Sequence, residues 1–235
     1  MSRNFDLLME IQNDLRVPGL HKAFATSPKP VADVAENSAN HDQIQQLVKH
    51  IFLDPGKPTP RQVVFCPVEA GKESSDVCAA VGRALAASKS GRVCVVSANL
   101  RSARLSVLFK VAPGSLDSAK SLTAGEECLL VAPNLWFAKA DYLANEAGNL
   151  KSRTALEMDL ANLRSAFDYL LIDAPAFSVS HETLILGRVA DATVLVVEAN
   201  KTRRQAARQA MRALDAEGIH VLGTVLTAAV KPNGS

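Results

Sequence analysis

The residues best suited to chemistry close the stretch VVFCPVEAGKESS, residues 63–75. An apolar run is followed by a short loop, then Gly71 and Lys72, then residues that suit the start of a helix. A phosphate-binding loop uses backbone N–H groups, a helix amino end and a lysine, and the Ser or Thr after that lysine holds Mg²⁺. Here that position is Glu73, so the order of strand, loop, Gly-Lys and helix fits a phosphate-binding loop, but the hydroxyl is missing.

The charge of Glu73 decides between two interpretations of this loop. Two like unit charges 4 Å apart cost about 4 kcal/mol at an effective dielectric of 20, and about 1.4 kcal/mol is tenfold in affinity. Side chains at Glu69 and Ala70, where such loops carry glycine, also crowd a phosphate. Without a nucleotide, Glu73 is favoured in the first turn of a helix by the helix dipole. Taken alone, the loop therefore favours an ordinary strand-to-helix turn.

Short apolar runs alternate with helical periodicity along the rest of the chain. This alternation predicts an α/β fold with a doubly wound, mostly parallel sheet covered on both faces. Ligands of such sheets bind at the carboxyl ends of the strands, where the stretches CPVEAGKE, SANLR and DAPAF lie. Strands are expected over 61–66, 92–97, 127–133, 169–173, 192–199 and 221–226, and helices over 42–53, 73–88, 155–167 and 202–217.

The amino-terminal part of the chain is predicted to be separate from this domain. Residues 1–17 fit an amphipathic helix, and residues 18–40 are rich in Pro, Ala, Ser and Asn, as linkers are. The α/β domain is expected over 41–235. One apolar face of the first helix, expected to pack on the core rather than on a partner, comprises Phe5, Leu8, Ile11 and Leu15.

Composition excludes several classes of protein. The 235 residues are 48% apolar with a formal net charge of +2, which suits one sizeable core and gives no reason to expect nucleic-acid binding. The apolar runs are strand-sized, the first residues do not resemble a secretory signal, and the four cysteines form no CxxC pair. We therefore expect a cytoplasmic protein with reduced thiols.

Two further motifs accompany the loop. The stretch VVSANLR places Ser97, Asn99 and Arg101 after a strand, and FDYLLIDAP does the same for Asp173. Together with the stretch VADATVLVVEANKTRRQAARQAMRAL, residues 189–214, these motifs resemble in order and spacing the bacterial tyrosine kinases of exopolysaccharide and capsule synthesis. That family is also called BY-kinases or the CpsD/CapB type. The resemblance covers nearly the whole chain and implies a P-loop NTPase-like fold with a deviant Walker motif, related to MinD and ParA.

The resemblance also implies site residues. Lys72 and Asp173 would be catalytic if the protein is active, and Asp173 would be a weak ligand for Mg²⁺. In the family two Asp residues of the second motif handle the metal and the catalytic proton; here Ser97 and Asn99 replace them, while Arg101 remains. The residues that correspond to nucleotide contacts are Gly71, Lys72, Glu73, Ser74, Arg203 and Arg204.

Other departures from the family pattern point the same way. The helix that builds a ring of subunits in the family carries Glu-x-x-Arg-x-x-Arg. The matching positions here are Asp42, Gln45 and Val48, so both Arg residues are missing and we expect no ring. The family usually ends in a Tyr-rich tail that is phosphorylated, whereas this chain has only Tyr142 and Tyr169. The metal site, the substrate and the oligomer contact all differ, which favours a pseudokinase.

The sequence therefore predicts a subunit of exopolysaccharide or capsular polysaccharide synthesis or export that is impaired in catalysis. It would act by binding a membrane-bound chain-length determinant, at the inner membrane through that partner, and ATP with Mg²⁺ would bind weakly or not at all. One alternative is an active ATP-dependent tyrosine autokinase with an altered metal site. The other is a ParA/MinD-type partition ATPase, which ranks last because Pro67 stands where that group has a second lysine.

A row of arginines, Arg204, Arg208 and Arg212, repeats at every fourth residue of the 202–217 helix, with Arg203 beside it. Such a row usually marks a solvated helix face. Arginines in the first turn nevertheless oppose the helix dipole, and an anion there would offset this cost. The sequence leaves open whether the row faces solvent, a phosphate or an acidic partner.

Overall fold

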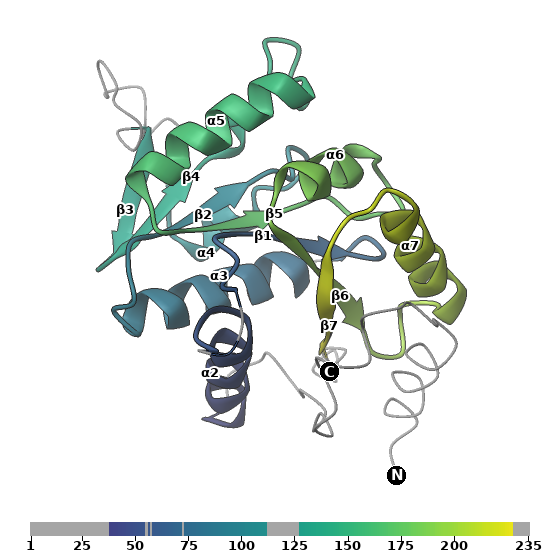
Figure 1. The fold of residues 1–235 in the computed structure, drawn as a ribbon, viewed down its shortest axis with the longest axis horizontal. Coiled ribbons are helices and arrows are strands. Elements are labelled where there is room, and N and C mark those ends of the chain that lie inside the picture. The colour runs from purple at the N-terminus through teal and green to yellow at the C-terminus, as the bar shows by residue number, and fades with distance from the viewer. Residues whose placement is uncertain (1–37, 55, 57, 72, 112–126, 228–235) are drawn as a thin grey trace, which may run out of the picture.

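The computed structural model describes residues 38–54, 56, 58–71, 73–111 and 127–227. A seven-stranded sheet in the order β3-β4-β2-β5-β1-β6-β7 forms its centre (Figure 1). Neighbouring strands are parallel except for β3 and β4, which are antiparallel. The strands are β1 (Gln62–Pro67), β2 (Val93–Ser97), β3 (Cys128–Ala132), β4 (Leu135–Ala138), β5 (Tyr169–Asp173), β6 (Ala192–Glu198) and β7 (Val221–Thr227).

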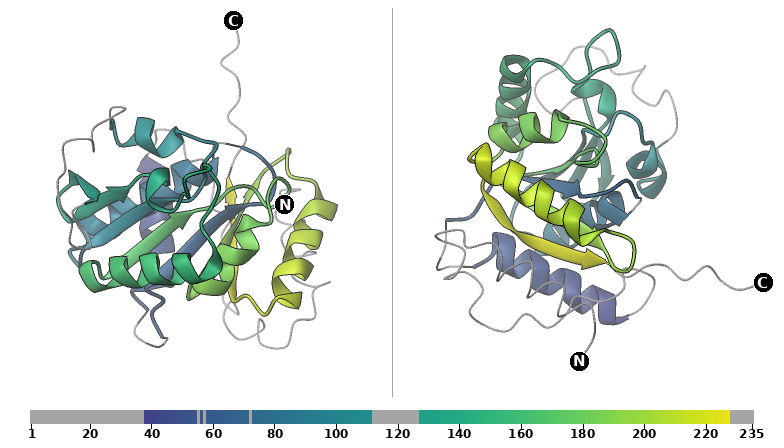
Figure 2. Two further views of the ribbon diagram at one scale, coloured as in Figure 1. Left: turned by 90° about the horizontal axis from the view of Figure 1, so that it is seen from above. Right: turned by 90° about the vertical axis from the view of Figure 1, so that its right-hand side faces the viewer.

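Helices cover both faces of the sheet (Figures 1 and 2). One face carries α2 (Ser38–Phe52), α3 (Glu73–Ala87) and α4 (Arg104–Leu108). The other carries α5 (Arg153–Ala166), α6 (Glu182–Val189) and α7 (Arg204–Ala216). Because both faces are covered, every residue of β1 and β2 is buried, which explains why these strands are continuous apolar runs. The doubly wound α/β prediction is confirmed.

The side chains of the central strands alternate between two cores, as the pleat requires. Val64 and Cys66 of β1 belong to the core under α5, α6 and α7. Val63 and Phe65 belong to the core under α2 and α3. Both cores end at the carboxyl edge of the sheet, so the loops that follow β1, β2 and β5 rest on well-packed strands.

Four elements were not predicted. Strand β4 forms a hairpin with β3, turning at Asn134, which has a positive φ of 58° that Asn tolerates. Helices α4 and α6 are short, with 5 and 8 residues, so their periodicity is weak in the sequence. A short 3₁₀ helix, η2, spans Ala140–Tyr142.

The amino-terminal boundary differs from the prediction. Helix α2 begins at Ser38, inside the segment assigned to the linker. The helix expected over 1–17 and most of the linker lie outside the described residues. Within the ranges that the structure describes, no helix has the length and apolar character needed to cross a bilayer.

Candidate functional site

The ends of three neighbouring strands bring the second and third motifs together. Ser97, the last residue of β2, is paired directly with Asp173, the last residue of β5. Phe65 of β1 is paired with Asp173 from the other side. The loop after β1 leads from this point into α3. The predicted convergence of Ser97 and Asp173 is therefore observed, whereas Lys72 lies outside the described residues.

Asp173 is a buried carboxylate held by two serines of α3. Its relative exposure is 1%. The Ser75 hydroxyl donates to Oδ2 at 2.6 Å, and the Ser74 hydroxyl lies 3.2 Å from Oδ1 and 3.4 Å from the Phe65 carbonyl oxygen. Burial raises the pKa of Asp173 to about 6, although the two serine hydrogen bonds lower it, and Asp76 contributes a smaller rise. Burial thus outweighs the hydroxyl groups at this carboxyl.

Glu69, in the loop after β1, is tied to the start of α7. Its carboxylate accepts a hydrogen bond from the backbone N–H of Arg203 at 2.8 Å and another from Nε of the same residue at 2.9 Å. The backbone hydrogen bond is the main cause that lowers the pKa of Glu69, and the side-chain contact with Arg203 adds to it. The side chain of Glu69 is thus directed to Arg203.

A third carboxylate near the loop also has a protein partner. Asp76, on α3, forms a bidentate contact with Arg104 at the start of α4; Nη2 of the arginine lies 2.8 Å from Oδ1 and 3.1 Å from Oδ2. The Nε of Arg104 donates to the same Oδ1 at 3.1 Å. This contact joins the helix of the first motif to the helix that follows the second motif.

The remaining predicted site residues are spread around this edge. Ser97 is buried, Asn99 is half-buried, and Arg101, Gly71 and Arg204 are exposed. The Asn99 carbonyl oxygen accepts from the Ser102 backbone N–H at 3.1 Å. Glu73 is the first residue of α3, but its side chain is not among those that the structure describes.

Ser75, Asp76 and Arg104 were missed in the sequence. Ser75 makes the shortest contact with Asp173. The available signal was the pair Ser74-Ser75 in the first turn of a helix that starts at a strand end, because donors there point toward the neighbouring strand ends. Arg104 gave no signal, since its partnership with Asp76 depends on the packing of α3 and α4.

This edge of the sheet fits Mg²⁺ poorly. Magnesium prefers carboxylate oxygens and water in an octahedral shell. Both oxygens of Asp173 already accept serine hydrogen bonds, and the carboxylate is almost inaccessible. Among the residues described, no group of three or more His, Cys, Asp or Glu is placed to hold a metal ion. The carboxylate keeps unused lone pairs, but its burial leaves little room for a hydrated ion, so its role as a weak ligand stays a prediction.

Helix α2 bears on the expected absence of a ring. Val48, which matches a position that is Arg in the resembling family, is 1% exposed and packs in the core, while Gln45 is half-buried and Asp42 is exposed. The face that includes Val48 is therefore used for folding. The oligomeric state itself stays a prediction.

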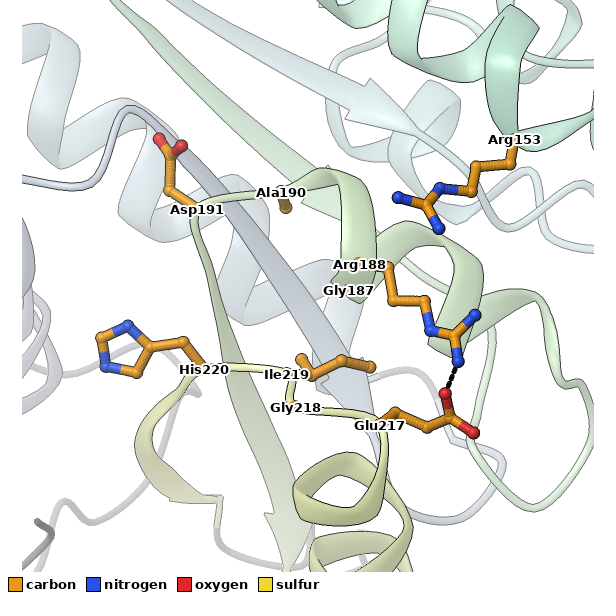
Figure 3. Close-up of a pocket in the computed structure, with 9 residues that line it drawn as sticks. All are labelled: Arg153, Gly187, Arg188, Ala190, Asp191, Glu217, Gly218, Ile219 and His220. Carbon is orange, nitrogen blue, oxygen red and sulfur yellow. Dashed lines mark ion pairs between the residues drawn. The ribbon is translucent and has the colours of Figure 1, made fainter.

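A hollow of about 560 Å³ lies at the opposite edge of the sheet (Figure 3). It is bordered by the residues that precede β6 and β7, Asp191 and His220. Arg188 and Glu217, on its wall, form an ion pair. Because the candidate site is at the carboxyl ends of the strands, this hollow is not part of it.

Comparisons with known proteins agree with this architecture. No protein-family model matches the chain, and no curated protein matches it. The kinase domain of the Escherichia coli tyrosine kinase ETK matches with a TM-score of 0.66 and 13% identity over 84% of this chain and 78% of that chain. The BceF tyrosine kinase domain matches with a TM-score of 0.60 and 18% identity over 97% and 90%.

MinD from Pyrococcus horikoshii, solved with Mg-ADP, matches with a TM-score of 0.56 and 18% identity over 71% of this chain and 69% of that chain. At such identities the likeness establishes the fold. The chain has the P-loop NTPase-like α/β fold that is shared by bacterial tyrosine kinase domains and MinD proteins.

Proposed function

We propose that this protein is a BY-kinase-like subunit of exopolysaccharide or capsular polysaccharide synthesis or export that has lost most or all of its catalytic power. It acts by binding a membrane-bound chain-length determinant rather than by phosphorylating a substrate. The likeness to the ETK and BceF kinase domains supports the family part of the proposal. The carboxylates at the candidate site support the loss of catalysis.

The observation that carries the proposal is that three carboxylates around the loop already have protein partners. Glu69 is bound by Arg203, Asp76 by Arg104, and Asp173 by Ser74 and Ser75. Phosphoryl transfer depends on metal ions that neutralise the phosphates and on a group that accepts the proton of the nucleophile. Arginines neutralise Glu69 and Asp76, and Asp173 is 1% exposed, so none of the three is readily accessible to a metal ion or a substrate hydroxyl. Ser97, beside Asp173, adds no charge.

Glu73 opposes nucleotide binding in the same proposal. It is the first residue of α3, so its carboxylate would meet a phosphate placed at that helix end. Changing Glu73→Thr should raise the affinity for ATP–Mg²⁺ by roughly tenfold or more because like-charge repulsion is removed. It should not restore tyrosine phosphorylation, because the acidic pair of the second motif remains absent. Titration calorimetry with and without Mg²⁺ measures the affinities.

Two matched variants separate charge from metal ligation. Glu73→Gln removes the charge without adding the loop hydroxyl, so it should recover most of the affinity gain, whereas Glu73→Asp should not. Adding Ser97→Asp and Asn99→Asp to Glu73→Thr should make binding depend on Mg²⁺. If the unchanged protein binds ATP–Mg²⁺ at low micromolar concentration and Glu73→Thr weakens it, Glu73 is a metal ligand, and the active autokinase replaces the pseudokinase.

A test in the source organism separates a binding subunit from a kinase. Deleting the gene should reduce polymer synthesis, and restoring the gene with Lys72→Ala should recover it, because the binding role does not use the loop lysine. Failure of Lys72→Ala to restore the polymer, with the protein present at normal levels, would show that nucleotide chemistry is required.

A further inference from the structure

Two cysteines, Cys94 and Cys128, are in contact with each other away from the candidate site. Their Sγ atoms are 3.9 Å apart, although the residues are 34 positions apart in the chain. Cys94 is in β2 and Cys128 is the first residue of β3. Both side chains belong to the core under α5, α6 and α7, where Cys94 is 0% and Cys128 is 8% exposed. The fold thus brings two sulfur atoms together in one buried place.

The other two cysteines provide a comparison within the same molecule. Cys66 in β1 and Cys78 in α3 are also buried and free. Cys66 donates to the carbonyl oxygen of the next residue, Pro67, and not to another sulfur. In the part of the chain that the structure describes, the contact between two sulfur atoms is found at Cys94 and Cys128 alone. A buried cysteine of this fold therefore does not need a sulfur neighbour.

The position of β4 argues against a disulfide between Cys94 and Cys128. Strand β4 lies between β2 and β3 in the sheet (Figure 1). Neighbouring strands are about 4.8 Å apart, so the backbones of β2 and β3 are separated by roughly 9–10 Å. A disulfide requires Cα atoms less than about 7 Å apart. The two side chains lean toward each other across β4, but their backbones are too far apart for the covalent bond.

The same spacing suits two sulfur ligands of a single metal ion. Metal–sulfur bonds are about 2.3 Å long, so two of them place the sulfur atoms up to roughly 4.6 Å apart. The observed separation of 3.9 Å lies within this span. An ion between the sulfur atoms therefore requires only small side-chain shifts, whereas a disulfide would require the backbone to move.

The kind and number of ligands select the ion. Thiolates are soft ligands, which favour Cu⁺ and Zn²⁺ over Mg²⁺ and Ca²⁺. Zn²⁺ takes four ligands in structural sites. Among the described residues, no third His, Cys, Asp or Glu is placed to join the two cysteines around a metal ion. Because Cu⁺ is stable with two sulfur ligands, it fits this pair better than Zn²⁺ does.

The pair can be reached from the edge of the sheet. Within the described ranges, β3 has a neighbouring strand on one side only. Leu130, two residues after Cys128, is 64% exposed. Segments with few buried contacts open locally at a lower free energy than central strands do. Local opening of β3 therefore gives an ion access to Cys128 and then to Cys94.

We propose that Cys94 and Cys128 together bind one Cu⁺ ion. As the ion binds, each thiol releases its proton to solvent and two Cu–S bonds form. The copper remains Cu⁺, so no oxidant or reductant takes part. The charge of the pair changes from zero to minus one, which is less unfavourable in an apolar core than two unpaired thiolates. The site depends neither on nucleotide nor on the proposed loss of catalysis.

Anaerobic titration of the reduced full chain with Cu⁺, in competition with the coloured chelator bicinchoninate, tests the site. The unchanged protein should bind one equivalent, and X-ray absorption should show two sulfur neighbours at about 2.2–2.3 Å. Cys94→Ala and Cys128→Ala should each weaken binding by more than about a hundredfold, because even the outer partners of metal ligands account for 10–100-fold. An equal amount of Zn²⁺ should not displace the copper.

Cys66→Ala and Cys78→Ala are the matched controls, because each removes a buried thiol of the same size and should keep the one equivalent. Thermal unfolding verifies that the variants are folded. Cu⁺ should raise the melting temperature of the unchanged protein and of both controls, but not that of Cys94→Ala or Cys128→Ala.

Three results overturn the proposal. The first is that the folded, unchanged protein binds no Cu⁺. The second is that binding survives both Cys94→Ala and Cys128→Ala, which places the copper elsewhere. The third is that the oxidant diamide readily forms a Cys94–Cys128 disulfide in the folded protein, detected by mass as the loss of two hydrogen atoms. The two backbones would then approach closely enough for the pair to be a redox couple.

Discussion

Two carboxylates of the candidate site, Glu69 and Asp173, have opposite electrostatic environments. Glu69 is in the loop after β1, and its partner Arg203 has a side chain that is 81% exposed. Asp173 ends β5 and is 1% exposed, and its partners are neutral hydroxyl groups. The backbone N–H of Arg203, and to a smaller extent its guanidinium, lower the pKa of Glu69, whereas burial raises the pKa of Asp173 to about 6.

The ionised form of Glu69 therefore stabilises the folded protein, whereas the ionised form of Asp173 destabilises it. Glu69 is stabilised as an anion by the contact that ties the loop to α7. The anionic form of Asp173 is destabilised, because the hydrogen bonds from two hydroxyl groups compensate only partly for the hydration that is lost on burial. An ionised Asp173 therefore lowers the free energy of unfolding at neutral pH. A buried ionisable group that lowers stability in this way is a candidate for function.

Asp173→Asn should have the largest effect on stability, because it removes the buried charge. The pKa of Asp173 rises from 3.8 to about 6 on folding, so its ionisation opposes folding. Stability from the neutral carboxyl is fully present below the unfolded value and is lost as the pH rises through about 6. The free energy of unfolding of the variant should therefore exceed that of the unchanged protein by up to about 3 kcal/mol at pH 8. Below pH 4 the two values should be nearly equal. Urea unfolding at several pH values measures the difference.

A gain that is the same at pH 4 and pH 8 would contradict the burial argument, since only the ionised carboxyl carries the penalty. Asp168→Asn provides a control at the opposite, amino end of β5. Its carboxylate accepts from the Arg92 backbone N–H at 2.7 Å, and the residue is half-buried. That variant should show no gain in stability at pH 8.

Ser75→Ala removes a hydrogen bond that stabilises the ionised form of Asp173. The Ser75 hydroxyl donates to the carboxylate at 2.6 Å, and hydrogen bonds to charged groups contribute about 1.5–3 kcal/mol. At pH 8 the variant should lose roughly 2 kcal/mol of unfolding free energy, and less at pH 4, where Asp173 is neutral. Thermal and urea unfolding at both pH values measure this loss.

Ser74→Ala is the matched control for that loss. The Ser74 hydroxyl is 3.2 Å from the carboxylate and is also within reach of the Phe65 carbonyl oxygen, so its removal should cost less. Equal losses for the two serines would mean that the short Ser75 contact has no special part in holding the ionised carboxyl.

The sequence predicted much of the fold because the information is local. Continuous apolar strands such as β1 and β5 alternate with helices, and this pattern determines a parallel sheet and the edge at which Ser97 and Asp173 meet. Helix α6 was missed because eight residues give little periodicity, and β4 because its four residues follow β3 after a tight turn.

The partners within the site were not predictable in the same way. Glu69 and Arg203 are 134 residues apart in the chain, and Asp173 and Ser75 are 98 apart. Each contact depends on how the loop after β1 is oriented over the strand ends, which no local pattern encodes. Motif comparison gave the right neighbourhood, because Ser74 and Arg203 were both assigned to it, but not which side chain each one would bind.

Glu69→Gln should have the smallest effect. The pKa of Glu69 is lowered from 4.5 on folding, so its ion pair adds stability above pH 4.5 that is lost as the pH falls through the folded value. Because Arg203 is largely exposed, solvent screens the pair, and the loss at pH 7 should be roughly 0.5–1 kcal/mol. The unfolding free energy of the variant should also fall less between pH 6 and pH 3 than that of the unchanged protein.

Arg203→Gln separates the two contacts, because it removes the Nε donor but keeps the backbone N–H that is the main cause of the lowered pKa. It should therefore keep much of the acid sensitivity that Glu69→Gln loses. Identical pH profiles for the two variants would assign the effect to the guanidinium alone, and Glu69 would then be an ordinary surface ion pair rather than a carboxylate bound by the start of α7.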